Sequence, residues 1–242
     1  MSEQEQILIT IDIATIDWTE GEHAGFSFRL KPGTNIRVDW GDGQSNQLYW
    51  TGSNDNVLLD HRYKCNKSVR NDYQVVISSS TPDAIIGIAS HTIDMEIVCL
   101  DISRCQSMEE LYFNNLPSID LTQNARLKDV DLPFYEGEAI DLSGNPLLRA
   151  FKLMYSNTLK ELSFTHNPLL KDVDCSQCHK LNKVVIANDS AIESFECSMS
   201  PITEKCMAWI EKAINRNREK REEAIMQEHS SNASQITTSL GR

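Results

Sequence analysis

Long apolar runs are missing from this sequence of 242 residues. No stretch approaches the roughly 20 consecutive apolar residues that a membrane-spanning helix requires, so we expect no membrane insertion. Basic residues are also scarce, since 23 Lys and Arg stand against 35 Asp and Glu and give a formal net charge of −12 at pH 7. Because a nucleic-acid ligand needs a basic surface for its phosphates, this balance excludes nucleic acid as the main partner.

Sequence motifs for catalysis are absent as well. The chain has no G-x-S-x-G, G-x-x-x-x-G-K-S/T, G-x-G-x-x-G or H-E-x-x-H segment. The signatures of an activated nucleophile, a phosphate-binding loop and a zinc protease are therefore missing. We expect a non-enzymatic protein that uses no cofactor.

Cysteine spacing gives no disulfide framework. The seven cysteines are an odd number scattered from Cys65 to Cys206, which favours reduced, buried thiols. Cys175, Cys178 and His179 form a C-x-x-C-H string, which alone suggests haem attachment or half of a zinc site. No second C-x-x-C segment exists, and the repeat described next places Cys175 at an inward position. We interpret both cysteines as small buried residues and expect no metal.

The sequence does contain an internal repeat, between Leu100 and Ser200. Two series of short segments, each built on apolar residues two apart, alternate along the chain, and within each series the starts lie 19, 21, 22 and 22 residues apart. The first series starts at Leu100, Ile119, Ile140, Leu162 and Val184. The second series starts at Leu111, Val130, Phe151, Val173 and Phe195. Matching periods in both series indicate a true structural repeat.

The spacing within each unit predicts short strands that stack. Apolar residues two apart lie on one face of a strand. A later apolar residue brings the chain back to the interior, and it is Met108, Leu127, Leu148, Leu170 or Ile192 in successive units. Because one unit cannot bury this face alone, units must cover one another. We predict a solenoid over residues 82–200, including an N-terminal cap, with Leu142 and Leu153 pointing inward.

A polar residue closes each segment of the first series. The position is filled in turn by Cys105, Asn124, Asn145, Asn167 and Asp189, and an amide there can bond main-chain groups of adjacent coils. This pattern resembles leucine-rich repeats, and more closely the variety of about 21–22 residues found in surface proteins of gut Bacteroidetes and related bacteria. The resemblance implies a bacterial recognition protein at a cell surface or in host interaction.

Residues 5–81 have a different pattern, with short runs rich in β-branched and aromatic residues between turn signals, which is typical of a β-sandwich. The segments NIRVDWGDG, LLDHRY and DYQVVIS resemble the polycystic-kidney-disease-type immunoglobulin-like domain. The matching residues are Asp39, Trp40, Gly41, Asp42, Gly43, His61, Tyr63, Tyr73 and Val75. Asp39 and Asp42 could hold Ca²⁺, but we favour a structural role in which their carboxylates accept hydrogen bonds from the turn.

The remaining segments connect and close these units. Residues 82–99 are expected to bridge the two domains, with the run IIGIAS pairing at the open end of the solenoid. After Ser200, apolar residues at helical spacing predict a capping helix over 201–228, followed by a disordered tail at 229–242. The predicted fold class is therefore mainly β: an N-terminal β-sandwich, a short leucine-rich-repeat solenoid and a C-terminal capping helix.

Outward positions of the second series supply the candidate binding residues. These are Tyr112, Phe134, Tyr135, Lys152, Met154 and Tyr155, with Asn114 and Asp131 between them. Exposed aromatic side chains with polar neighbours are typical of a protein or glycan site. The competing interpretation is that the N-terminal domain or the helix covers these residues inside the monomer.

The leading hypothesis is a non-enzymatic module that binds a protein or glycan ligand, for example in surface recognition or adhesion. An intracellular scaffold is the alternative. Localisation stays open at this stage: a native N-terminus as printed indicates the cytoplasm, and a removed leader indicates the cell surface or secretion.

Overall fold

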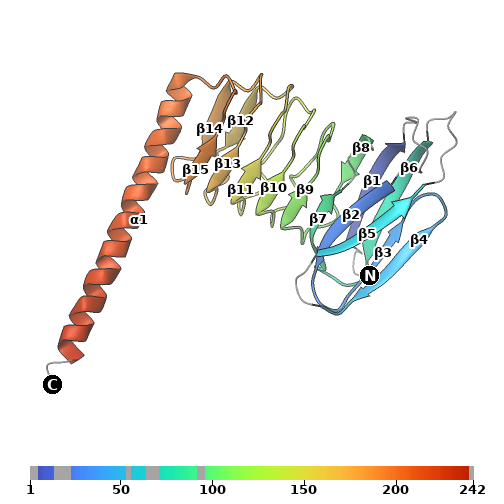
Figure 1. Cartoon of the computed structure of the whole chain (residues 1–242), viewed down its shortest axis with the longest axis horizontal. Coiled ribbons are helices and arrows are strands. Elements are labelled where there is room, and N and C mark those ends of the chain that lie inside the picture. Colours follow the sequence, from blue (N-terminus) through green and yellow to red (C-terminus); the bar gives the residue numbers. More distant parts are fainter. Residues whose placement is uncertain (1–4, 14–22, 53–55, 64–70, 92–95, 240–242) are drawn as a thin grey trace.

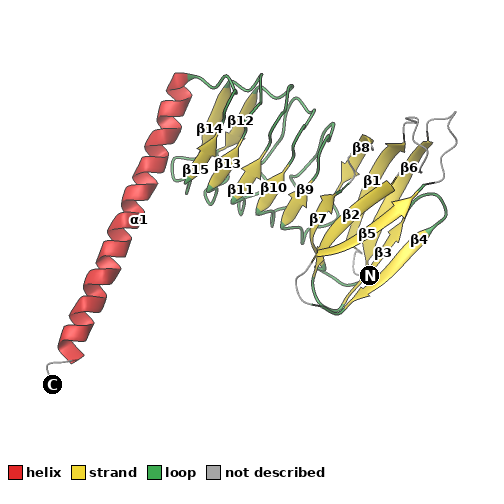
Figure 2. Cartoon of the chain, viewed as in Figure 1, coloured by secondary structure: helices red, strands yellow, loops and turns green. Residues whose placement is uncertain are grey.

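The computed structural model describes residues 5–13, 23–52, 56–63, 71–91 and 96–239. Within them the chain is mainly β, with one long C-terminal helix (Figure 2). An N-terminal unit of longer strands is followed by a β-solenoid-like stack of about five turns, and the helix lies at the far end of that stack (Figure 1). In the described part of the chain, no helix has the length and apolarity to cross a membrane.

Two sheets build the N-terminal unit. The five-stranded sheet has the order β4-β3-β6-β1-β8, and each neighbouring pair in it is antiparallel. Its strands are β1 (Glu5–Ile13), β3 (Thr34–Asp39), β4 (Ser45–Trp50), β6 (Asn71–Ser79) and β8 (Glu96–Asp101). The second sheet has eight strands, of which β2 (His23–Leu30), β5 (Asn56–Arg62) and β7 (Ile85–Ser90) belong to this unit.

The eight-stranded sheet continues from the N-terminal unit into the solenoid. β7 pairs in parallel with β9 (Glu110–Tyr112), so that Ile88 lies opposite Leu111. The other strands of the second repeat series follow in parallel: β10 (Asp129–Asp131), β11 (Ala150–Lys152), β13 (Asp172–Asp174) and β15 (Ser194–Glu196). The segment predicted to bridge the domains therefore joins them through a shared sheet.

The first repeat series forms fewer strands than its spacing predicts. The segment at Leu100 begins at the end of β8 and pairs there with β1, and the last two segments pair with each other as β12 (Glu161–Phe164) and β14 (Lys183–Ile186). The segments at Ile119 and Ile140 form no strand. In the preceding two coils, Asp120 and Asp141 each accept a hydrogen bond from the backbone N–H two residues later, at 2.9 Å. These side chains fold the backbone into turns where a strand was expected.

Inward residues of the coils form a continuous core. Leu142 and Leu153 are buried, as predicted, and so are all five residues that return the chain to the interior: Met108, Leu127, Leu148, Leu170 and Ile192. Burying a side chain of this size stabilises the fold by roughly 1.5–3 kcal/mol. The stack is therefore held by aliphatic packing that runs from coil to coil.

Buried asparagines connect the coils at their turns. The Asn145 amide donates to the carbonyls of Leu121 and Asn124, at 2.9 and 3.0 Å. Asn124 and Asn167 repeat this pair of bonds on their own preceding coils. Asp189, at the fifth turn, is exposed and does not continue the ladder.

The turn after β3 uses its charged residues structurally. Asp39 Oδ1 accepts from the Gly41 N–H at 3.1 Å, and Asp42 Oδ1 accepts from the Gln44 N–H at 2.9 Å. Asp42 Oδ2 also lies 2.8 Å from His61 Nε2. Burial raises the pKa of Asp42, but these hydrogen bonds outweigh it and hold the pKa below its ordinary value. Trp40 is buried beside them.

The C-terminal helix α1 (Glu204–Ser239) covers the last coil with its first half. Ile210 and Ala213 are buried, and the Asn217 amide donates to the carbonyls of Ser190 and Ile192, each at 2.9 Å. The helix is longer than predicted: the segment 229–242, expected to be disordered, is helical as far as Ser239. Its second half extends away from the stack (Figure 1).

Candidate binding face

One face of the eight-stranded sheet points away from the core of the solenoid. The strand register arranges its side chains in two rows, which we call the outward rows. One row contains Tyr112, Asp131, Lys152, Asp174 and Glu196. The other contains Glu110, Asp129, Ala150, Asp172 and Ser194. Since neighbouring strands lie roughly 4.8 Å apart, each row is a continuous strip of side chains, most of them carboxylates.

A column of residues with positive φ lies beside these rows. It contains the fifth residue of each second-series segment, namely Asn115, Phe134, Tyr155, Gln177 and Met199, with φ between 55° and 63°. Each N–H in this column, up to Gln177, donates to a carbonyl of the next coil, at 2.8–3.1 Å. The ladder of hydrogen bonds between coils therefore continues through residues with a left-handed backbone. L-amino acids with bulky side chains rarely adopt this conformation. We call this set the left-handed column.

Two members of the left-handed column form an exposed aromatic pair. The rings of Phe134 and Tyr155 are stacked, with 4.8 Å between their centroids and 12° between their planes. The two residues remain 49% and 43% exposed. The left-handed backbone that holds these two rings in water is less stable than the right-handed one by about 1–2 kcal/mol per residue. Backbone strain of this kind clusters at functional sites.

A hollow of about 340 Å³ lies next to the aromatic pair, where the N-terminal unit meets the solenoid. Tyr112, Asp131 and Phe134 line it from the coils, and Ser90 and His91 line it from the end of β7. The volume falls at the lower end of the range for small-ligand pockets. It is large enough to receive a side chain or a sugar ring of a larger ligand.

Burial shifts the charges on this face. Burial raises the pKa of Asp131, Lys152 lowers it and Asp174 raises it further, and the net pKa lies above its ordinary value. Burial and the carboxylates of Asp129 and Asp131 likewise raise the pKa of Tyr112. Asp131 Oδ1 is buried and has no hydrogen-bond partner among the described residues. This face therefore carries a carboxylate whose solvation is incomplete.

Most of the sequence-predicted site residues lie together. Tyr112, Phe134, Lys152 and Tyr155 are exposed on or beside the outward rows, and Met154 is half-buried between them. The N-terminal unit and α1 leave these four exposed, so internal packing does not cover them.

Tyr135 does not belong to this face. It is only 1% exposed, and its hydroxyl donates to the Ala139 carbonyl at 2.9 Å. The left-handed backbone of Phe134 interrupts the alternation of side chains, so the next residue points inward. The repeat carries a signal for this, because the equivalent positions hold Leu116, Ser156 and Cys178, none of them charged, and all three are buried in the structure.

Ser90, His91 and Arg29 were missed by the sequence-based prediction. Arg29 forms an ion pair with Glu110, and His91 Nε2 lies 2.7 Å from Ser27 Oγ. All three reach the face only because β2 pairs with β7 and β7 pairs with β9. The sequence predicts that IIGIAS, which forms β7, pairs at the open end of the solenoid, but no local pattern reveals that β2 pairs with β7.

Cysteine chemistry does not contribute to this face. Cys175 and Cys178 are buried, and burial raises the pKa of both thiols above the ordinary range. Their sulfurs lie near main-chain carbonyls, with Cys178 Sγ 2.9 Å from Leu153 O. In the described part of the chain, no cluster of three or more His, Cys, Asp and Glu side chains could hold a metal ion.

The fold therefore defines a mainly β protein with a β-solenoid-like stack that shares a sheet with its N-terminal unit. Comparisons of the chain with protein-family models, with curated proteins and with solved structures found no match.

Proposed function

We propose that this protein is a non-enzymatic recognition module that binds a protein or glycan ligand on the outward rows and the left-handed column. In this proposal the coils are leucine-rich repeats of the bacterial kind, and the N-terminal unit is a β-sandwich of the polycystic-kidney-disease type. The observation that carries the function is the exposed, stacked pair of Phe134 and Tyr155.

Two features of the coils support the leucine-rich-repeat assignment. The starts of successive units lie 19–22 residues apart, close to the 20–29 residues of known leucine-rich repeats. Asn124, Asn145 and Asn167 recur at the polar position of the signature, and each donates to two carbonyls of the preceding coil. Polar side chains that satisfy buried backbone between coils are what such a stack requires.

The chemistry of the face supports ligand binding. Aromatic residues dominate the energetics of protein interfaces because they bury a large area at low entropic cost. The aromatic pair supplies two such rings at one point of the surface, and the hollow beside it supplies a recess with a carboxylate and a phenol. Flat rings and carboxylates together also suit the apolar faces and hydroxyl groups of a sugar.

The proposal is tested by panning a phage-displayed random-peptide library, and by probing a glycan array, with the full-length chain. Ligands found in this way are then measured against the double variant Phe134→Asn with Tyr155→Asn. Asn is chosen because Asn115 occupies the same left-handed position one coil earlier, so the backbone tolerates it. Tyr49→Asn is the matched control, since Tyr49 is a 65% exposed aromatic residue on β4, outside the face.

We expect the double variant to weaken binding by at least about thirtyfold, which corresponds to the loss of about 2 kcal/mol at an aromatic hot spot. The Tyr49→Asn control should bind as the unmodified chain does. Ligands that bind the double variant with unchanged affinity would remove the basis for this function.

A further inference from the structure

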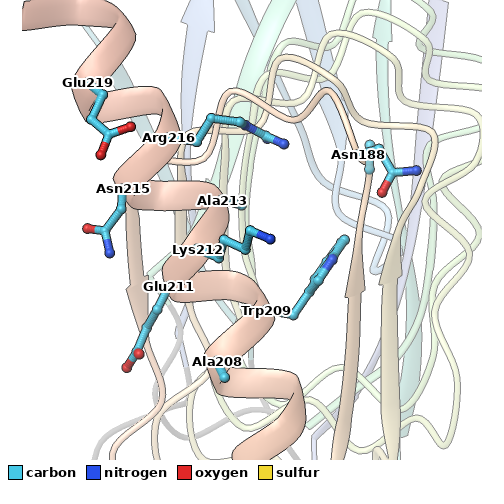
Figure 3. A pocket seen from close by; sticks show the side chains of 10 residues that line it. Asn188, Ala208, Trp209, Glu211, Lys212, Ala213, Asn215, Arg216 and Glu219 are labelled. Carbon is cyan, nitrogen blue, oxygen red and sulfur yellow. The ribbon is translucent and has the colours of Figure 1, made fainter.

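A second hollow, of about 660 Å³, lies between α1 and the loop that follows β14 (Figure 3). Its lining comes from Ala187 and Asn188 on the loop and from Trp209, Lys212 and Arg216 on the helix, among others. None of these residues belongs to the outward rows or to the left-handed column. The volume lies in the middle of the range for small-molecule sites.

Helix geometry separates the charges around this hollow. Trp209, Lys212 and Arg216 are three and four residues apart in succession, which places them on one side of α1. Figure 3 shows their side chains pointing into the space toward Asn188. Glu211 and Glu219 also line the hollow, but their carboxylates lie on the other side of the helix. Two cationic groups and an indole therefore point into the space near Asn188, and the two glutamates line the hollow on its other side.

The guanidinium of Arg216 is incompletely bonded. Its Nε atom is buried and has no hydrogen-bond partner among the described residues. An arginine stays protonated at any ordinary pH, so this N–H cannot escape the cost of burial by losing its proton. A buried donor without a partner is unfavourable, and an oxyanion is the acceptor that fits a guanidinium best.

The indole of Trp209 completes the site. Trp209 is 37% exposed, so one part of its ring is packed and another part remains open. Flat rings stack on an indole, which adds an attraction beyond simple burial of area. Since the net charge of the chain repels anions at long range, binding here has to rest on contacts made within the hollow.

We propose that this hollow binds a small organic anion in which a carboxylate is joined to a flat ring. The carboxylate accepts hydrogen bonds from Arg216, and Lys212 adds a second positive charge. The ring packs against Trp209. This site shares no residue with the face proposed to bind the protein or glycan ligand. An experiment can therefore disprove one proposal and leave the other standing.

The test is a calorimetric titration of the full-length chain at pH 7 with three probes: 2-naphthoate, its neutral amide 2-naphthamide, and acetate. We expect 2-naphthoate to bind and both other probes to bind at least about tenfold more weakly. The amide lacks the charged carboxylate, and acetate lacks the ring. The variant Arg216→Gln should weaken 2-naphthoate binding at least about tenfold. Arg218→Gln, an exposed site on the same helix, should leave it within twofold.

Three results would overturn the proposal. These are no binding of 2-naphthoate to the unmodified chain at millimolar concentration, equal binding of 2-naphthoate and 2-naphthamide, or equal losses in the Arg216 and Arg218 variants. Circular dichroism checks that α1 remains helical in each variant, as expected because Gln is a good helix former. Trp209→Ala gives a second reading, since it should weaken 2-naphthoate binding about tenfold and leave the weak binding of acetate unchanged.

Discussion

Phe134 and Tyr155 stack on each other across neighbouring coils while both have a left-handed backbone, with φ of 58° and 63°. The two facts are linked, because the left-handed conformation turns each ring outward in the segment after its strand, where simple alternation would place it inward. The ring of Phe134 thereby reaches the edge of the hollow that Tyr112 and Asp131 also line. The geometry of the face depends on backbone conformations that most side chains disfavour.

Substitutions at Tyr155 separate the backbone cost from the ring contact. Both Tyr155→Asn and Tyr155→Val remove the stacked ring, but only Val strongly resists a positive φ. We expect Tyr155→Val to have a free energy of unfolding about 1–2 kcal/mol lower than Tyr155→Asn, measured by urea denaturation. At Lys152, in strand β11, the order of the same two substitutions should reverse, because Val favours strands. Equal stabilities of the two Tyr155 variants would mean that the backbone there is not left-handed in solution.

Much of the solenoid could be predicted from the sequence because its determinants repeat. Leu142 and Leu153 point inward as their spacing indicates, and Asn145 bonds the preceding coil as its recurrence indicates. Because the repeat gives each position an equivalent in several coils, a prediction for one coil can be checked against the residue types in the others. Tyr135 was predicted to be an outward binding residue without this comparison, and it is buried like its equivalents Leu116, Ser156 and Cys178.

Other features depend on interactions that no local pattern contains. Asp120 and Asp141 are exposed, and their carboxylates accept hydrogen bonds from the turns that follow, where the spacing predicted strands. Arg29 reaches Glu110 on the binding face only through the pairing of β2 with β7, which joins segments far apart in the sequence. The helix beyond residue 228 has few apolar residues, so composition favoured a disordered tail where the chain is helical to Ser239.

The asparagine ladder should be the most sensitive polar feature of the stack. Asn145→Ala leaves the carbonyls of Leu121 and Asn124 without their donor inside the core. An unpaired buried group costs about 1–3 kcal/mol, so we expect a loss of about 2–4 kcal/mol in the free energy of unfolding. Asp189→Ala, at the exposed fifth turn, should change it by less than about 0.5 kcal/mol.

Asn145→Asp extends this test to pH. An ionised carboxylate at this position has no proton to donate to the two carbonyls, whereas the protonated form can donate to one of them. The Asn145→Asp variant should therefore be closer in stability to the unmodified chain at pH 4 than at pH 7. Thermal melts at both pH values measure the effect. A variant equally stable at both would show that the amide is not needed as a donor.

Asp131 is expected to reduce stability at neutral pH. Its pKa in the folded state is raised by burial, so the folded chain holds this proton more tightly than the unfolded chain does. Stability then falls as the pH rises from the ordinary carboxyl pKa through the raised one, and the loss is complete above it. Replacing Asp131 with Asn should raise the melting temperature at pH 7 and change it little at pH 3.

The control for this pH dependence is Glu138→Gln, an exposed carboxylate that changes the net charge by the same amount. It should leave the melting temperature nearly unchanged at both pH values. If Asp131→Asn instead lowered the melting temperature at pH 7, the carboxylate would be stabilising the fold. Asp131 would then not be a residue that reduces stability for the sake of ligand binding.

The cysteines test the interpretation of the C-x-x-C-H string. Cys175 and Cys178 are buried with raised pKa values, whereas Cys99 is exposed. Because the thiolate is the reactive form, iodoacetamide should alkylate Cys99 in the native protein within minutes and leave Cys175 and Cys178 unmodified until the chain is unfolded. Mass spectrometry of tryptic peptides measures the extent at each site. Rapid labelling of Cys175, or stoichiometric zinc, iron or haem in the purified protein, would show that these two residues do more than fill the interior of the fourth coil.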